Sequence, residues 1–393
     1  MNGCVLSDRT PEPGYWEIKH VFQPVVAEKG EDGKSIKVTN RHYFRDLSAY
    51  DCTLVRLVDG REVSRRSLDL PLAPRGVATI PVDDATGSYR ILFTQNRDEG
   101  FWPKGWTIAD DQIDFAAPAV CAAPKGRLEF GFCPKSGELV SIKSGRLFKT
   151  ELLAEPLTLD IWRAPSQNEY RQEKVIWENC GFANPRRSLV SFSDKTGADG
   201  VRRVKSVVDY AVTGTVFRVE SDWTIADGAA KVKAVFTQSG ESREPAHIGF
   251  RTVLREKSMP VEWLGRGPFE NYSDRMSGAF LGLWKLNSDD FFFPYDVPQD
   301  CGNREGTYRV TLSPGMFDDL TVESAASFAF EVNPYTPETL VKYAHPAELP
   351  PSESTYLGIF AKSRGLGGNS CGPMPLPRDI VGVGPYTLEF VIR

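Results

Sequence analysis

The sequence predicts an all-β protein built from two successive domains. Short runs rich in β-branched and aromatic residues recur along the whole chain, and turn-forming residues separate them. Asp-Gly pairs at 59–60 and 227–228 stand between such runs, where this dipeptide favours the tight turn of a β-hairpin. The stretch AAPAVCAAPKG at 116–126 has no periodicity and is typical of a linker. We therefore expect one domain at 1–118 and a second at 119–393.

The first domain is expected to be an immunoglobulin-like β-sandwich. Strand patterns occupy residues 35–40, 52–60, 77–82 and 88–95, within a segment of about a hundred residues that is otherwise turns. Short strands at this spacing suit a seven-stranded immunoglobulin-like or fibronectin-like fold.

The second domain is expected to be a large β-sandwich. Residues 127–132, 137–143, 216–225, 231–238 and 386–392 alternate or run β-branched and aromatic. Two short helices are predicted, at 169–179 and at 336–344, the latter with Thr336 as its cap before Pro337.

The composition is typical of a soluble globular protein, with 41% apolar and 25% charged residues. The net charge is −5 and neither sign runs in blocks, which argues against a nucleic-acid or membrane partner. Seven cysteines without a CxxC pair suggest neither a disulfide framework nor a zinc site. Without a signal peptide or an apolar run of ~20 residues, we expect a cytoplasmic protein.

The segment VEWLGRGPFENYSDRMSGAFLGLW, at 261–284, is the most informative part of the sequence. Its glycines and proline turn the backbone sharply, and its polar side chains need partners if the loop is buried. Glu270, Asn271, Asp274 and Arg275 are therefore predicted to fix a structural loop, together with Arg304 of PYDVPQDCGNREG. A catalytic role for Glu270, with Asp274 as its partner, is the alternative that we weigh less, because carboxylates near arginine usually serve structure.

LGRGPFENYSDR closely resembles the LGxGPxENYxDR signature in the C-terminal region of β-galactosidases of glycoside hydrolase family 2. Four further segments resemble that region in the family's order: NGCVLSDRTPEPGYWEIKH at 2–20, WRAPSQNE at 162–169, PYDVPQDCGNREG at 294–306 and GGNSCGP at 367–373. The resemblance implies an immunoglobulin-like sandwich that follows the catalytic barrel, and then a small-chain domain with a mutarotase-like β super-sandwich.

The resemblance also implies that the catalytic residues of the enzyme lie outside this sequence. Retaining glycosidases use two carboxyl groups ~5 Å apart, and in this family both stand on an α/β barrel. The sequence lacks the alternating strands and helices of a barrel, so we expect no catalytic residue and no metal or cofactor in it. We expect the C-terminal portion or small subunit of an oligomeric enzyme that hydrolyses terminal non-reducing β-D-galactosides. Its partners would be a catalytic large chain or barrel domain and the galactoside.

Six residues are candidates for substrate binding. By resemblance, the GGNSCGP loop reaches the active-site mouth, where Asn369 and Ser370 would meet hydroxyl groups. Cys371 stands where some relatives have a stacking tryptophan, and an ordinary hairpin loop is the alternative. Arg163 and Asn168 either contact sugar hydroxyls or anchor a loop. The remaining candidate is His345 in YAHPAEL, a general acid or base if the mutarotase-like fold uses it, and otherwise a scaffold residue.

Two rival functions remain open from the sequence. A stand-alone carbohydrate-binding module would bind galactosides without a partner. A mutarotase-like isomerase would require His345 to face a carboxylate across an open cleft.

Overall fold

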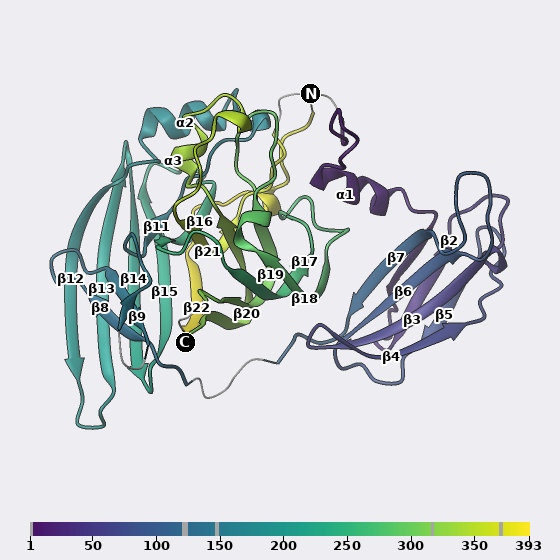
Figure 1. Ribbon diagram of the computed structural model, residues 1–393, viewed down its shortest axis with the longest axis horizontal. Helices are drawn as coiled ribbons and strands as arrows, with labels where there is room; N and C mark the ends of the chain where they lie inside the picture. The colour runs from purple at the N-terminus through teal and green to yellow at the C-terminus, as the bar shows by residue number, and fades with distance from the viewer. Residues whose placement is uncertain (1–2, 120–124, 146–148, 316–317, 369–371) are drawn as a thin grey trace.

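The structure is a computed structural model that describes residues 3–119, 125–145, 149–315, 318–368 and 372–393. Its regular elements are mainly strands, which confirms the predicted all-β class. Figure 1 shows a smaller sandwich on the right and a larger domain on the left, with helix α1 (Pro13–Val21) lying between them. Neither of these two parts resembles an α/β barrel.

The N-terminal part is a sandwich of two antiparallel sheets, as predicted for an immunoglobulin-like domain. One sheet has three strands in the order β1-β2-β5 and the other has four in the order β4-β3-β6-β7. Alternate side chains point into a shared core, so that Val25, Ile36, Val38 and Ile91 are completely buried. The strands are β1 (Val25–Lys29), β2 (Ser35–Asn40), β3 (Tyr50–Val58), β4 (Arg61–Leu68), β5 (Val77–Pro81), β6 (Ser88–Gln95) and β7 (Thr107–Asp114).

The C-terminal part is dominated by a twelve-stranded sheet. Its main path is β11-β16-β21-β20-β22-β15-β14-β13-β12, and β17, β18 and β19 extend it through β20. A three-stranded sheet, β10-β9-β8, accompanies it. The strands are β8 (Glu129–Phe132), β9 (Leu139–Ser144), β10 (Thr150–Glu151), β11 (Thr158–Asp160), β12 (Arg186–Thr196), β13 (Arg202–Val212), β14 (Thr215–Ala226), β15 (Ala229–Gly240), β16 (His247–Leu254), β17 (Pro260–Gly267), β18 (Phe280–Asn287), β19 (Asn303–Leu312), β20 (Leu320–Asn333), β21 (Thr355–Ser363) and β22 (Tyr386–Ile392).

Both Asp-Gly pairs form the predicted hairpin turns. Asp59 and Gly60 have φ of 48° and 72° between β3 and β4, and Asp227 and Gly228 have φ of 50° and 68° between β14 and β15. Two consecutive positive φ angles are the geometry that this dipeptide tolerates best.

The helices agree with the sequence only in part. The predicted helix at 169–179 is displaced: a 3-10 turn occupies Gln167–Glu169 and α2 begins at Glu173 and ends at Cys180. The second is present as α3 (Pro337–Leu340), capped by Thr336 as predicted but shorter. Helix α1 was not predicted, although Pro13 at its first turn was an available signal. No helix in the described ranges has the length and apolar character needed to cross a membrane.

Direct contacts join the two parts of the chain. The side-chain amide of Gln112 on β7 donates to the carbonyl of Leu281 at 2.7 Å and accepts from its N–H at 2.5 Å. The Leu283 N–H donates to the Gly60 carbonyl at 3.3 Å, and a Cβ at Gly60 would lie 2.5 Å from that nitrogen.

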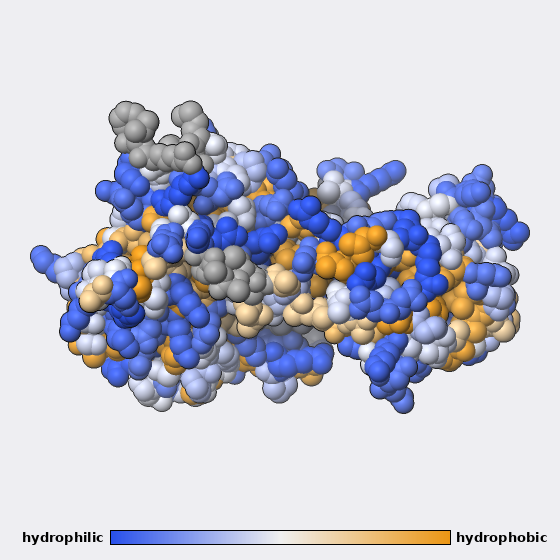
Figure 2. All heavy atoms as spheres, turned by 90° about the horizontal axis from the view of Figure 1, so that it is seen from below, coloured by the Kyte–Doolittle hydropathy of each residue, from blue (hydrophilic) through white to orange (hydrophobic). Residues whose placement is uncertain are grey.

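On the face seen in Figure 2, hydrophobic side chains gather in patches over the smaller sandwich, on the right.

Candidate functional site

A polar cleft brings together segments from all five parts of the chain that resemble the galactosidase region. Its volume is about 380 Å³. The walls come from the segment before α1, the 166–168 turn, the loop after β17, the 295–299 segment and the start of the glycine loop. The lining residues are Glu12, Ser166, Gln167, Asn168, Asp274, Arg275, Tyr295, Asp296, Gln299, Leu366 and Gly367. Three of the predicted substrate-binding or loop positions, Asn168, Asp274 and Arg275, therefore lie in one cleft.

Asp274 fixes the backbone at the entrance to the glycine loop. Its carboxylate accepts hydrogen bonds from the N–H groups of Leu366, at 3.0 Å, and Gly367, at 2.7 Å. The side chain of Asn168 donates to the Leu366 carbonyl at 3.2 Å. A Cβ on Gly365 would lie 2.4 Å from the Asp274 carboxyl carbon, so a glycine is needed for this approach.

A fully buried arginine also holds the backbone that leads into the glycine loop. Arg163, three residues after the end of β11, donates to the carbonyls of Arg364 at 3.0 Å and Gly365 at 2.7 Å, and to Glu169 at 2.7 Å. Asp300 lies 3.7 Å from its other terminal nitrogen. Burial alone would lower the pKa of Arg163, but Glu169 and Asp300 outweigh it and raise the pKa. Arg163 is thus an anchor of the loop base and has no exposed surface for a sugar.

Glu270 is engaged on both oxygens within the protein. It pairs with Arg275 and accepts from the Tyr295 hydroxyl at 2.5 Å on one oxygen, and from the Gly302 N–H at 3.0 Å on the other. Only 4% of the residue is exposed. A carboxylate held in this way stabilises the loop, and its position offers no open path to a substrate.

Asn271 and Arg304 complete the loop. The Asn271 side chain accepts from the Glu305 N–H at 2.9 Å and donates to the Phe269 carbonyl at 3.1 Å. Arg304 donates to the Pro268 carbonyl at 3.0 Å and lies over the ring of Phe291, with 4.8 Å to the centroid. Burial lowers the pKa of Arg304 to about 10.

Comparison with known proteins decides the family. The family model described as the β-galactosidase small chain matches residues 125–392, and the model of β-galactosidase domain 4 matches residues 36–116. The chain belongs to the β-galactosidase small chain family. This confirms the resemblance drawn from the five motifs.

The relatives of this family member are longer proteins. A protein named β-galactosidase from Halalkalibacterium halodurans is 26% identical over 99% of this chain and 41% of its own length. Another with the same name, from Priestia megaterium, is 26% identical over 94% of the chain and 38% of its own length. The chain therefore spans about two-fifths of the relatives that it matches.

Solved structures with a related shape include a galactose mutarotase-like protein from Lactobacillus casei. It has a TM-score of 0.40 and 12% identity, and covers 69% of this chain and 97% of its own. A galactose mutarotase related enzyme from Lactobacillus acidophilus has a TM-score of 0.39 and 9% identity, and covers 68% of this chain and 95% of its own.

His345, a further predicted site residue, does not line the cleft. It is exposed and caps a short 3-10 turn, where its N–H donates to Glu348 at 3.3 Å. Asn369, Ser370 and Cys371 lie outside the described residues.

Sequence reasoning missed a second group of buried polar residues deep in the larger domain. His247 on β16 lies 3.1 Å from Asp160 and stacks on Phe360 at 4.0 Å between centroids. Asp160 also accepts from the Tyr356 hydroxyl at 2.5 Å. Burial and neighbouring acids raise the pKa of Glu331 on β20 well above its usual range. The available signal was a titratable residue within an apolar strand, which is costly unless it is paired.

No group of three or more His, Cys, Asp and Glu side chains suited to a metal ion occurs within the ranges that the structure covers.

Proposed function

We propose that this chain is the non-catalytic C-terminal portion, or small subunit, of a β-galactosidase that hydrolyses terminal non-reducing β-D-galactosides. The barrel with the acid/base and the nucleophile would lie outside these 393 residues, on another chain or another part of a longer one. The observation that carries the proposal is the polar cleft, in which the family's motif residues are used to hold the base of the glycine loop.

The chain would complete the active-site mouth on the aglycone side. Asp274, Asn168 and Arg163 fix the backbone before the glycine loop, so that Asn369 and Ser370 could present hydrogen-bonding groups to a sugar. Cys371 would give only a weak platform, since a thiol is small and forms poor hydrogen bonds. A preformed loop base reduces the entropy lost on substrate binding.

The chain would also support assembly with the catalytic chain. Phe44 and Phe101 are each 98% exposed, in the loops before β3 and before β7. The two loops are tied together by the ion pair between Arg45 and Glu99. Neighbouring exposed aromatic side chains are typical of protein–protein contact surfaces, where aromatic residues contribute much of the binding energy. We place the complete enzyme in the cytoplasm as an oligomer, with no cofactor on this chain.

The alternative functions receive less support. A mutarotase-like isomerase would need His345 in an open cleft with a carboxylate, whereas His345 is exposed on a 3-10 turn away from the polar cleft. A stand-alone carbohydrate-binding module would bind galactosides with no partner, and the experiment below includes that outcome.

Sedimentation of this chain mixed with its separately produced catalytic chain tests the proposal. We expect a stable complex, which buries at least about 1,000 Å² in total. Phe44→Ser combined with Phe101→Ser should weaken the complex at least about tenfold, because interface aromatics contribute a large share of binding energy. Val63→Ser is the matched control, since Val63 is also exposed, at 52%, on β4. The absence of a complex, together with galactoside binding by this chain alone, would favour the binding module.

A further inference from the structure

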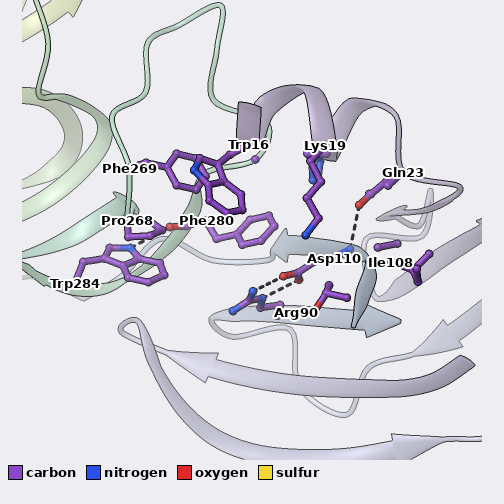
Figure 3. Close-up of a pocket in the computed structure, with 14 residues that line it drawn as sticks. Trp16, Lys19, Gln23, Arg90, Ile108, Asp110, Pro268, Phe269, Phe280 and Trp284 are labelled. Atoms are coloured by element: carbon purple, nitrogen blue, oxygen red, sulfur yellow. Dashed lines mark hydrogen bonds and ion pairs between the residues drawn. The ribbon is translucent and has the colours of Figure 1, made fainter. Parts of the chain in front are cut away.

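A second pocket lies between the two domains, separate from the polar cleft. Its volume is about 270 Å³, and it is enclosed by one face of α1, by β6 and β7, and by the loop and strand at 268–284. Figure 3 shows the rings of Trp16, Phe269, Phe280 and Trp284 along one side of it. Trp16 stacks on Phe269 with 5.7 Å between centroids and 12° between planes. Aromatic walls and a few polar groups at a domain junction are the usual features of a small-molecule site.

The charged groups of this interdomain pocket leave one ammonium uncompensated. Asp110 is the carboxylate in the lining, and Arg90 binds both of its oxygens, one at 2.7 Å from Nε (Figure 3). Lys19 extends from α1 into the pocket, where its Nζ lies 5.9 Å from the ring centroid of Trp16 and 5.2 Å from that of Trp106. It forms no ion pair with a carboxylate in the described part of the chain. Together, Lys19, Arg90 and Asp110 of the lining thus carry one net positive charge.

Several polar groups of the pocket already have hydrogen-bond partners, which limits the class of ligand that the pocket can bind. Gln23 accepts from the Asp110 N–H at 3.0 Å and donates to Asp111 at 2.8 Å, and the indole N–H of Trp284 donates to the Gly265 carbonyl at 3.1 Å. A ligand with many hydroxyl groups would leave most of them without partners, which is costly in a partly enclosed site. A flat apolar ligand with a single negative charge would pack against the aromatic rings and pair with the ammonium group of Lys19.

We propose that the interdomain pocket binds a small aryl carboxylate, with its ring among the aromatic side chains and its carboxylate at Lys19. The ligand would contact α1, β7 and the 268–280 loop together, and would therefore stabilise the docking of the two domains. The pocket is formed within this chain alone. The proposal thus does not depend on the β-galactosidase role, and it can be tested without a catalytic chain.

Saturation-transfer NMR with the full 393-residue chain tests it, with benzoate as the probe. For a ligand of this size we expect a dissociation constant on the order of 1 mM. Benzamide, which has the same shape and no charge, and galacturonate, which has the charge on a hydroxylated ring, should each bind about tenfold more weakly.

Three variants locate the binding. Lys19→Met should weaken benzoate about tenfold, whereas Lys19→Arg should change it less than about threefold. Lys29→Met is the matched control, because Lys29 also lies over an aromatic ring, at 4.8 Å from Phe115, but outside the pocket. If Lys19→Met impairs folding, tenfold higher salt on the wild-type chain should weaken benzoate and leave benzamide unchanged. No saturable benzoate binding, equal binding of benzamide or galacturonate, or no effect of Lys19→Met or of salt would overturn the proposal.

Discussion

Removing Arg163 should destabilise the larger domain more than any surface charge can. Arg163→Met keeps much of the side-chain volume but takes from Glu169, which is completely buried, its nearer charged partner, so that only the Nε atom of Arg364 remains, at 4.0 Å. It also removes the nearest positive charge from Asp300, one oxygen of which already has no hydrogen-bond partner within the described structure. Breaking a buried ion pair on one side costs about 3–5 kcal/mol of unfolding free energy.

That loss is large enough to measure. For a domain of this size it corresponds to a fall in the thermal midpoint of roughly 6–20 °C. Urea unfolding followed by tryptophan fluorescence gives the free energy directly. Arg203→Met is the matched control, because Arg203 and its partner Asp199 are each 50% exposed in their side chains, and a solvent-exposed ion pair contributes little to the free energy of unfolding.

The double variant Arg163→Met with Glu169→Gln tests the cause. It should recover part of the lost stability, because the buried carboxylate that lost its hydrogen-bonded partner is then gone. A loss below about 1 kcal/mol for Arg163→Met, or no recovery in the double variant, would refute the view that Arg163 anchors the loop base through charge.

Three further predictions concern the cleft, Glu305 and the glycine loop. Asp274→Asn should speed hydrogen exchange of the Gly367 amide about tenfold, because an amide oxygen is a weaker acceptor than a carboxylate; an unchanged rate would contradict this. Burial raises the pKa of Glu305 from 4.5 to about 7, so wild-type stability should fall as pH rises through that window. Glu305→Gln should make that slope shallower in urea midpoints measured at several pH values, and the exposed control Glu220→Gln should leave it unchanged. In the complete enzyme, Cys371→Trp should tighten a disaccharide substrate by up to ~1 kcal/mol in steady-state kinetics while changing a small aryl galactoside little; equal effects on both would place the loop elsewhere.

The sequence predicts those parts of the fold that depend on local chemistry. The strands Ser35–Asn40 and Ser88–Gln95 have the predicted bounds, because their alternating pattern sets one face against the core. The displaced start of α2 has a local cause that helix periodicity alone does not reveal. Glu169 pairs with Arg163 and accepts from the Ser166 N–H at 2.8 Å, so the chain forms a tight turn there before α2 begins.

The sequence predicted which motifs form the site but not how their residues contact one another. Resemblance indicated that the polar loop residues belong together, but the contact of Asp274 with Leu366 spans 92 positions and has no local signal. The same holds for His247 and Asp160, which meet only because β11 and β16 are neighbours in the sheet. The interdomain pocket depends on α1, which the pattern of strands did not reveal.

Reconstitution of hydrolysis tests the central claim most directly. A chromogenic β-galactoside would be incubated with this chain, with the separately purified catalytic chain, and with the two mixed in equal amounts. We predict no turnover above buffer by this chain and full turnover only in the mixture, because under the proposed function the acid/base and nucleophile would lie elsewhere and this chain would complete the mouth of the site. Turnover by this chain alone that Glu270→Gln abolishes, or full activity of the catalytic chain without it, would contradict the account.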